Sequence, residues 1–409
     1  AECSELRLSC FLRECLMPHP RPAARQLWPF AGFYFCYFSF VGVTSPYWGL
    51  YLASLGLTPW AIAVLASMPS LARVTAPGFW GWLADRHGQR RRLVRLTTSL
   101  AALSFAGLFL DGRFAWLFAV LALAHFFWAA PLPLVDASVL SRTADSPGAY
   151  SRVRLWGSIG FVVMSLLVGY LLEFMPMAQL PWVVLATLLG LAAFAWRLPD
   201  TPSPPARHSQ QPFMATLRQP VMRRVYLVTV LMAVAHGPYY AFYSIGLKAH
   251  GWQASQIGWL WTLGVLAEIT AFWWMPRILA RVSLAQLLRF GLLMAVLRFA
   301  VIAALPDVPA VMMAMQLLHA FTFATHHTAS IGLIHQAAPP EHQAKSQGLY
   351  WVLGYGLGGG IGGLAAGALW PHGQMLAAFG LSCAAALLGW LCALRWPTSV
   401  QQARTMPSA

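Results

Sequence analysis

Residues 155–172 read LWGSIGFVVMSLLVGYLL, eighteen consecutive positions without a charged side chain. An apolar run of about this length is enough to cross the hydrocarbon core of a bilayer as an α-helix. The apolar residues follow one another instead of alternating with polar ones, which favours a helix over a barrel strand. A second run of the same character covers residues 364–396. Both segments therefore predict membrane-spanning helices.

The whole chain has a membrane-protein composition. Hydrophobic residues make up 58% of the sequence and charged residues only 10%, whereas a soluble domain carries about 25% charged residues. In lipid the backbone must satisfy its own hydrogen bonds, so only helices and closed barrels span the bilayer. We predict an all-α integral membrane protein with twelve transmembrane helices, over residues 28–54, 59–83, 93–110, 114–140, 153–173, 181–198, 223–247, 254–279, 284–305, 308–336, 345–369 and 373–396.

The twelve helices divide into two sets of six. We expect an N-terminal bundle at 28–198 and a C-terminal bundle at 223–396, joined by a polar linker at 199–222 that is rich in Pro, Ser, Gln and Arg. A cytoplasmic tail at 1–27 precedes them and another at 397–409 follows. The chain does not begin with Met, and residues 1–16 are too polar for a signal peptide. We therefore expect the natural start at Met17.

The two sets of helices look like one repeat. Halves related in this way are found in carriers whose substrate site lies near the membrane midplane, between the halves. The matching segments are 46–48 with 238–240, and Ser151 and Trp156 with Ser346 and Trp351. The repeat therefore predicts two pseudo-symmetric bundles around a central site.

The arginines are unevenly distributed among the loops. The net charge is +15, and most of the arginines in the loops between the predicted helices lie at 84–92, 141–152, 199–222 and 280–283, while the opposite loops carry little beyond Arg113 and Lys248. Cytoplasmic loops are enriched in Lys and Arg, so we predict a multi-pass protein of the bacterial inner membrane with both termini cytoplasmic. No basic face alternates with stacking aromatics, which argues against nucleic-acid binding.

The sequence contains no pattern of an enzyme or a metal site. The six cysteines form no CxxC pair, and the histidines of 308–336 have no carboxylate or cysteine at ligand spacing. The glycine-rich stretch 354–367 is not a phosphate loop, because no Gly-Lys-Ser/Thr follows. Its GxxxG spacing favours close helix packing and sliding. We expect no enzyme activity, no metal and no cofactor.

The segment at residues 81–92 reads GWLADRHGQRRR and joins the second and third predicted helices. Gly88 permits the positive φ of a tight turn. The segment resembles the GxLaDRxGrrr signature of the major facilitator superfamily, with Gln89 where a basic residue is usual. The resemblance implies that Asp85 and Arg86 form a conformational gate that holds the halves together on the cytoplasmic side. The alternative is a plain loop that only sets topology.

Several further segments resemble the 3-phenylpropionate transporter family. They are residues 133–137 (PLVDA), 150–158 (YSRVRLWGS), 235–240 (AHGPYY), 261–268 (WTLGVLAE) and 316–319 (QLLH). That family is similar to the lactose permease and nucleoside symporter branch, which uses a proton gradient. The resemblance implies a monomeric carrier that moves a small organic anion, such as a phenylpropanoid acid, together with protons by alternating access. Proton-coupled efflux of a drug or metabolite is the alternative, and a membrane sensor is a remote one.

Ionisable residues inside the membrane usually face a cavity or a partner. Glu268 is our candidate proton carrier, with Arg298 and His319 as the partners that switch its charge. A structural ion pair of Glu268 with Arg298 or Arg73 is the alternative. The arrangement resembles the lactose permease, but no Asp or Glu lies between residues 308 and 336 here. The predicted proton-coupling set is Glu268, Arg298, His319, His327 and Arg73.

Arg154 is our candidate for binding a substrate carboxylate, because a guanidinium can donate two parallel hydrogen bonds to it. The alternative is an interfacial arginine that extends toward the head groups, as Arg152 is expected to do. Tyrosines of the first and seventh helices could stack on a ring, or could simply pack the core. The predicted substrate-binding set is Arg154, Asp136, His236, Tyr47 and Tyr240.

Overall fold

The structure is a computed structural model, and it describes residues 24–143, 146, 148–200 and 212–396. Most of the predicted tail 1–27, including Met17, lies outside the described residues. The tail 397–409 and residues 201–211 of the predicted linker lie outside them as well.

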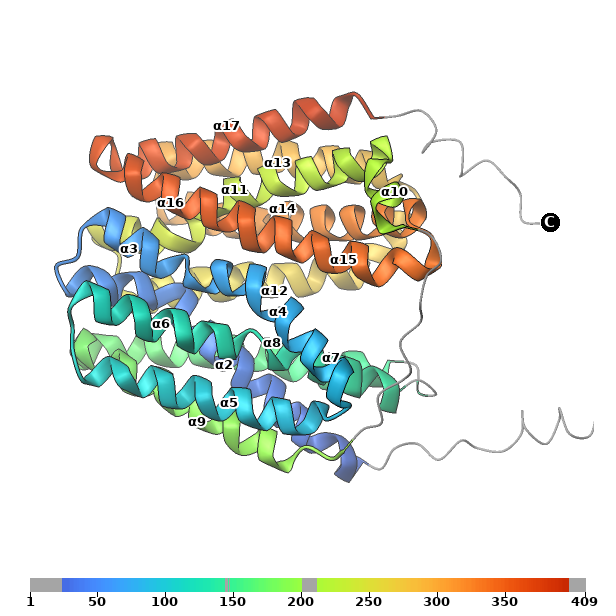
Figure 1. Cartoon of the computed structure of the whole chain (residues 1–409). Helices are drawn as coiled ribbons and strands as arrows, with labels where there is room; N and C mark the ends of the chain where they lie inside the picture. The colour runs from blue at the N-terminus through green and yellow to red at the C-terminus, as the bar shows by residue number, and fades with distance from the viewer. Residues whose placement is uncertain (1–23, 144–145, 147, 201–211, 397–409) are drawn as a thin grey trace, which may run out of the picture.

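The described part of the chain is helical and contains no strand, which confirms the predicted all-α membrane fold. Figure 1 shows the helices of the first half, blue to green, below those of the second half, yellow-green to red. The first half comprises α2 (Ala24–Ser54), α3 (Pro59–Ala66), α4 (Met68–His87), α5 (Arg90–Ala106), α6 (Phe114–Trp128), α7 (Pro131–Arg142), α8 (Ala149–Phe174) and α9 (Leu180–Arg197). The second half comprises α11 (Pro220–Ala249), α12 (Ala254–Leu279), α13 (Leu284–Ala304), α14 (Pro309–Ala337), α15 (Gln343–Trp351), the π-helical η4 (Val352–Gly358), α16 (Gly359–Leu369) and α17 (Gln374–Leu394). A short helix, α10 (Phe213–Arg218), precedes α11.

Eleven helical segments of the described chain are long and apolar enough to cross a membrane. The helix of membrane length that is not among them is α14, with 29 residues. Its sequence is less apolar because it carries a series of buried polar side chains: Gln316, His319, Thr322, Thr325, His326 and Ser330. Polar residues in a spanning helix are tolerated where they face protein or a cavity instead of lipid. The tenth predicted helix, α14, is therefore the one whose side chains are best suited to line a site.

Two predicted helices are interrupted in the structure. The predicted helix 59–83 is divided into α3 and α4 at Ser67, and the predicted helix 114–140 is divided into α6 and α7 at 129–130. Pro69 and Pro131 stand at the starts of α4 and α7. Proline has no N–H to donate and its ring clashes with the preceding turn. Each interruption therefore lies where a helical hydrogen bond would be lost.

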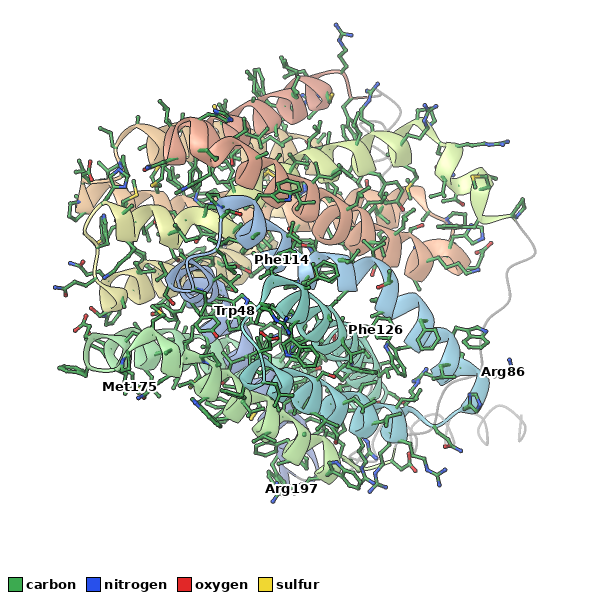
Figure 2. All side chains as sticks on the ribbon, turned by 60° about the vertical axis from the view of Figure 1, so that its left-hand side comes forward. Trp48, Arg86, Phe114, Phe126, Met175 and Arg197 are labelled. Carbon is green, nitrogen blue, oxygen red and sulfur yellow. The ribbon has the colours of Figure 1, made fainter. Side chains whose placement is uncertain are left out.

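The two ends of the bundle can be distinguished by their charged residues. Figure 2 shows Arg86, near the end of α4, and Met175, just after α8, at opposite ends of the molecule. We call the end that carries Arg86 the basic end and the other the distal end. The start of α2 and the end of α17 lie on the same side of the bundle (Figure 1), as an even number of crossings requires.

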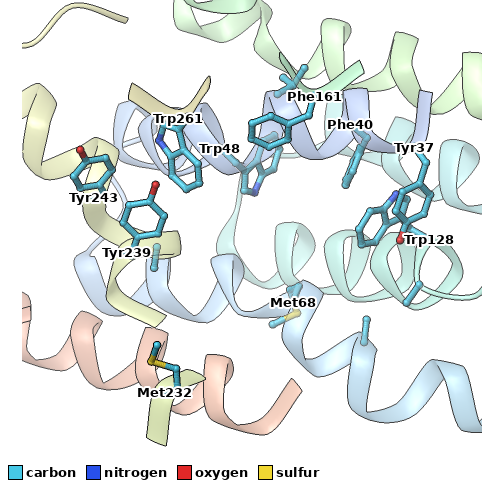
Figure 3. Close-up of a cluster of buried hydrophobic side chains, with 14 of the residues drawn as sticks. Tyr37, Phe40, Trp48, Met68, Trp128, Phe161, Met232, Tyr239, Tyr243 and Trp261 are labelled. Carbon is cyan, nitrogen blue, oxygen red and sulfur yellow. The ribbon is translucent and has the colours of Figure 1, made fainter. Parts of the chain in front are cut away.

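Aromatic side chains fill the core of both halves (Figure 3). Tyr37 of α2 stacks on Trp128 of α6 with ring centroids 4.5 Å apart, and Tyr239 of α11 lies 4.7 Å from Trp261 of α12. Glycine allows α8 to approach α2 closely, because a Cβ on Gly160 would lie only 2.3 Å from the carbonyl oxygen of Phe35. Close packing of this kind holds membrane helices together, since lipid supplies no hydrophobic drive between them.

Candidate functional site

The second half contains an acidic residue facing a histidine. The carboxylate of Glu268 on α12 lies 3.8 Å from Nε2 of His319 on α14. The side chain of Glu268 is 23% exposed and that of His319 is 8% exposed. His236 of α11 adjoins this pair, with its ring centroid 6.1 Å from that of His319. The structure thus brings together three of the predicted site residues from three helices.

Arg298 of α13 does not pair with Glu268. It is fully buried, its Nε donates to the carbonyl of Met315 at 2.9 Å, and its guanidinium lies 4.4 Å from the ring centroid of Tyr239. Among the described residues Glu268 has no ion pair with Arg298 or with Arg73. The structural ion pair considered as an alternative for Glu268 is therefore not formed in this structure.

A hydrogen-bond network connects Arg298 to α11. Gln316 receives a hydrogen bond from Tyr239 at 3.0 Å and one from Arg298 at 3.5 Å through its Oε1, and it donates to the hydroxyl of Tyr243 at 2.6 Å. All of these side chains are buried. Sequence reasoning did not select Gln316, Tyr239 or Tyr243 as site residues, although Gln316 lies in a segment that resembles the transporter family.

The first half contains a second polar cluster around Asp136 of α7. The Asp136 carboxylate accepts hydrogen bonds from the hydroxyl of Tyr34 on α2 and, at 3.3 Å, from that of Tyr150 on α8. Arg154 lies beside it, with its guanidinium 3.9 Å from the ring centroid of Phe38 and 5.4 Å from that of Tyr34. Tyr34, Phe38 and Tyr150 are partners that sequence reasoning had not selected.

Arg154 is oriented into the bundle. It is partly buried against aromatic rings of α2, and it acts electrostatically on Asp136 and, across the two halves, on Glu268. In the described part of the chain Arg154 has no ion pair. Arg152, two residues earlier, is exposed. The geometry thus gives an unpaired guanidinium that faces the centre of the molecule.

Two further predicted residues, Arg73 and Tyr240, face the same centre. Arg73 of α4 acts electrostatically on Tyr37 and His125 of the first half and on Tyr240 of the second half. Tyr240 is 43% exposed although it lies in the middle of α11. Its ring centroid lies 6.4 Å from that of His236 and 6.0 Å from that of Trp261, beside the Glu268–His319 pair.

The other two predicted site residues are held by hydrogen bonds. The Nδ1 of His327 lies 3.0 Å from the hydroxyl of Tyr350. Tyr47 is fully buried, and its hydroxyl donates to the carbonyl of Ser165 at 2.6 Å and lies 3.4 Å from that of Ala254. Tyr47 therefore lies in the contact between the halves, and contact with a substrate stays a prediction for this residue.

The halves are joined by hydrogen bonds toward the distal end. Besides Tyr47, the hydroxyl of Ser165 on α8 donates to the carbonyl of Gly258 on α12 at 3.3 Å. The indole of Trp259 donates to the hydroxyl of Tyr170 at 2.9 Å. These contacts close α2 and α8 of the first half against α12 of the second.

The predicted gate at the basic end is not engaged. Gly88 has a φ of 65°, as the tight turn requires. Asp85 and Arg86 are both exposed, and the guanidinium of Arg86 lies 5.5 Å from the ring centroid of Trp82 on the same helix. Asp85 has no hydrogen-bond or ion-pair partner among the residues that the structure describes. The structure therefore combines joined halves at the distal end with an exposed Asp85 that has no partner among the described residues at the basic end.

The sequence matches a family model, the MFS_1 like family, over residues 27–381. The chain belongs to this family. A relative, the probable 3-phenylpropionic acid transporter of Escherichia coli (strain K12), is 33% identical over 74% of this chain and 80% of its own length. The maltose permease of Geobacillus stearothermophilus is 28% identical over 87% of this chain and 91% of its own length.

Solved transporter structures share the fold. The nucleoside transporter NupG superposes with a TM-score of 0.78 at 15% identity, covering 93% of this chain and 100% of that one. The predicted resemblance to major facilitator carriers is thereby confirmed, and the chain is a secondary transporter of that type, not an enzyme. It is a multi-pass membrane protein with a small-molecule substrate.

Proposed function

We propose that this transporter carries a small organic anion, an aromatic carboxylate in particular, together with protons across the bacterial inner membrane. It acts as a monomer by alternating access, and both termini lie in the cytoplasm. One observation carries the proposal: Arg154 of the first half is packed against the Phe38 and Tyr34 rings without an ion pair in the described chain, while Glu268 of the second half faces His319.

Arg154 binds the substrate carboxylate. Its guanidinium has no competing ion pair in the described chain, and its contact with the Phe38 ring limits the rotamers that it can adopt. Asp136, held by Tyr34 and Tyr150, supplies the nearby negative charge that balances Arg154 when no substrate is bound. A carboxylate substrate is supported by the similarity to the probable 3-phenylpropionic acid transporter of Escherichia coli.

Glu268 carries the proton. In this mechanism the positive charge of Arg154 favours the ionised form of Glu268 when no substrate is bound. A substrate carboxylate on Arg154 neutralises that charge, so protonation of Glu268 becomes more favourable once the anion has bound. His319 lies within reach to pass the proton, and Arg298 and Gln316 position the helix that carries it. Binding of anion and proton are thus linked through one arginine.

Alternating access uses contacts at the two ends. Under the proposed orientation the distal end is periplasmic, and the hydrogen bonds of Tyr47 to Ala254, of Ser165 to Gly258 and of Trp259 to Tyr170 close it. The basic end is cytoplasmic, where Asp85 has no partner among described residues, as expected of a state open to the cytoplasm. In the outward-open state we expect Asp85 to engage the second half.

The test is transport by the purified protein in proteoliposomes. An imposed inward proton gradient should drive uphill uptake of 3-phenylpropionate, and the gradient should be dissipated only when the anion is present. Uptake that is indifferent to the gradient would contradict proton coupling. Transport of the neutral amide as fast as the acid would contradict the anion site, and would favour efflux of a neutral or cationic compound instead.

A further inference from the structure

An aromatic stripe on α14 begins at the Glu268–His319 pair. Phe323 and His327 follow His319 at intervals of four residues, so the three rings lie on one face of the helix. The His319 and Phe323 rings are stacked with centroids 5.8 Å apart, and the Phe323 and His327 rings lie 6.0 Å apart and nearly parallel. The stripe therefore leads from the charged pair toward the basic end, where α14 ends.

Helix α12 and the continuous α15–η4 segment add rings to this stripe. On α12, Phe272 follows Glu268 by four residues and meets the edge of His327 at 6.3 Å. Trp351, at the end of α15, lies 5.4 Å from His327. Tyr355 of η4 lies 4.7 Å from Trp351 and 6.1 Å from Phe323. Rings from three helices thus surround one position, next to the proposed proton site.

These rings present open surface to the centre of the molecule. Trp351 is 44% exposed and Phe272 is 38% exposed, whereas Tyr350, behind them, is fully buried and bonded to His327. Tyr355 acts electrostatically with Glu268 and with Tyr240. Phe323 stacks on His319 and contacts Tyr355, so the rings are continuous with the Glu268–His319 pair.

The backbone that carries Tyr355 has unusual geometry. Val352–Gly358 forms a π-helical turn between α15 and α16, and such turns occur frequently at functional sites. Glycines allow this turn to lie between the two halves: a Cβ on Gly356 would come within 2.7 Å of Val74 on α4, and one on Gly354 within 2.8 Å of Thr229 on α11. The position of Tyr355 is thus tied to a contact between the halves.

We propose that Phe272, Phe323, Trp351 and Tyr355 form a binding subsite for the ring of the transported anion, which we call the ring subsite. The inference rests on the proposed function, because Arg154 holds the carboxylate. The ligand class that fits is a planar aromatic ring on a short chain that ends in a carboxylate. Such a ligand contacts α8 of the first half and α12, α14 and η4 of the second, so its binding draws the halves together.

The experiment compares two acids of equal charge and similar size, 3-phenylpropionate and 3-cyclohexylpropionate. Binding of both is measured calorimetrically to the wild type and to Trp351→Leu and Tyr355→Leu. Ring stacking favours the aromatic acid, and we expect each substitution to weaken its binding about tenfold while leaving the saturated acid nearly unaffected. Tyr355→Phe keeps the ring and should retain the aromatic preference.

Trp156→Leu is the matched control. Trp156 corresponds to Trp351 in the sequence repeat and is 48% exposed on α8 of the first half. Because Trp156 is not part of the ring subsite, its loss should leave the preference for the aromatic acid over the saturated acid unchanged. If the preference for the aromatic acid survives in both Leu variants, or if both acids lose affinity equally, the ring subsite is refuted.

The amide of 3-phenylpropionate tests the proposed function separately. If the wild type binds this amide as tightly as the acid, the anion site itself is refuted.

Discussion

Replacing Arg154 by alanine should weaken binding of an aromatic carboxylate by about tenfold to a hundredfold. A hydrogen bond to a charged group contributes about 1.5–3 kcal/mol, and about 1.4 kcal/mol corresponds to a factor of ten in affinity. No ion pair in the described chain has to be broken before Arg154 binds the anion, so most of this free energy is available to the ligand. Calorimetry on purified protein measures it directly.

Arg154→Lys and Arg152→Ala sharpen this test. An ammonium retains the charge but cannot donate two parallel hydrogen bonds, and it loses the stacking on Phe38, so Lys should recover only part of the affinity. Arg152 is exposed, and its loss should leave binding unchanged. The reasoning is refuted if Lys at this position binds as well as Arg, or if Arg154→Ala weakens binding of the acid and of its neutral amide equally.

Three other substitutions probe the coupling, the distal contact and the packing. Glu268→Gln should abolish proton-driven accumulation and keep counterflow exchange, because the amide mimics the protonated carboxyl; uphill uptake by this variant in proteoliposomes would remove Glu268 from the mechanism. Tyr47→Phe removes the hydroxyl that lies 3.4 Å from the carbonyl of Ala254 in the second half. A hydrogen bond contributes about 0.5–1.5 kcal/mol, so this variant should raise periplasmic labelling of cysteines introduced between the halves about twofold to tenfold; unchanged labelling would count against a gating role. Gly160→Ala forces a methyl against Phe35 and should destabilise the protein by about 1–3 kcal/mol, measured as a lower Tm, whereas Gly380→Ala, with open space at its Cβ position, should not.

The membrane helices were predictable because lipid imposes a simple rule on sequence. About twenty apolar residues span the bilayer. The charges of the loops can be counted in the sequence without knowing any tertiary contact. The meeting of Glu268 and His319 was also predictable, since ionisable residues in a membrane are rare enough to stand out. The same rarity directed attention to Arg154 and Asp136.

The hydrogen-bond partners of these ionisable residues were not predictable, because they belong to common residue types. Tyr34, Tyr150 and Tyr243 belong to a residue type that is common in the chain, with 12 tyrosines, so nothing in the sequence distinguishes a hydrogen-bonded tyrosine from a packing one. The π-helical turn at Val352–Gly358 was interpreted only as a glycine-rich packing surface, because a change of hydrogen-bond register leaves no compositional trace. A gating role for Asp85 stays a prediction, because a contact that forms in another conformational state leaves no separate pattern in the sequence.

The polar character of α14 has a consequence for how the protein is made. A segment that carries several polar side chains partitions less readily into lipid on its own, and an arginine at the centre of a helix opposes insertion by about 2.5–3.5 kcal/mol. Arg298 of α13 donates to the carbonyl of Met315 on α14 and lies near Gln316, so each of these helices satisfies the most unfavourable group of the other. We therefore expect α13 and α14 to leave the translocon together as a helical hairpin, with the residues of the central site assembled during biosynthesis.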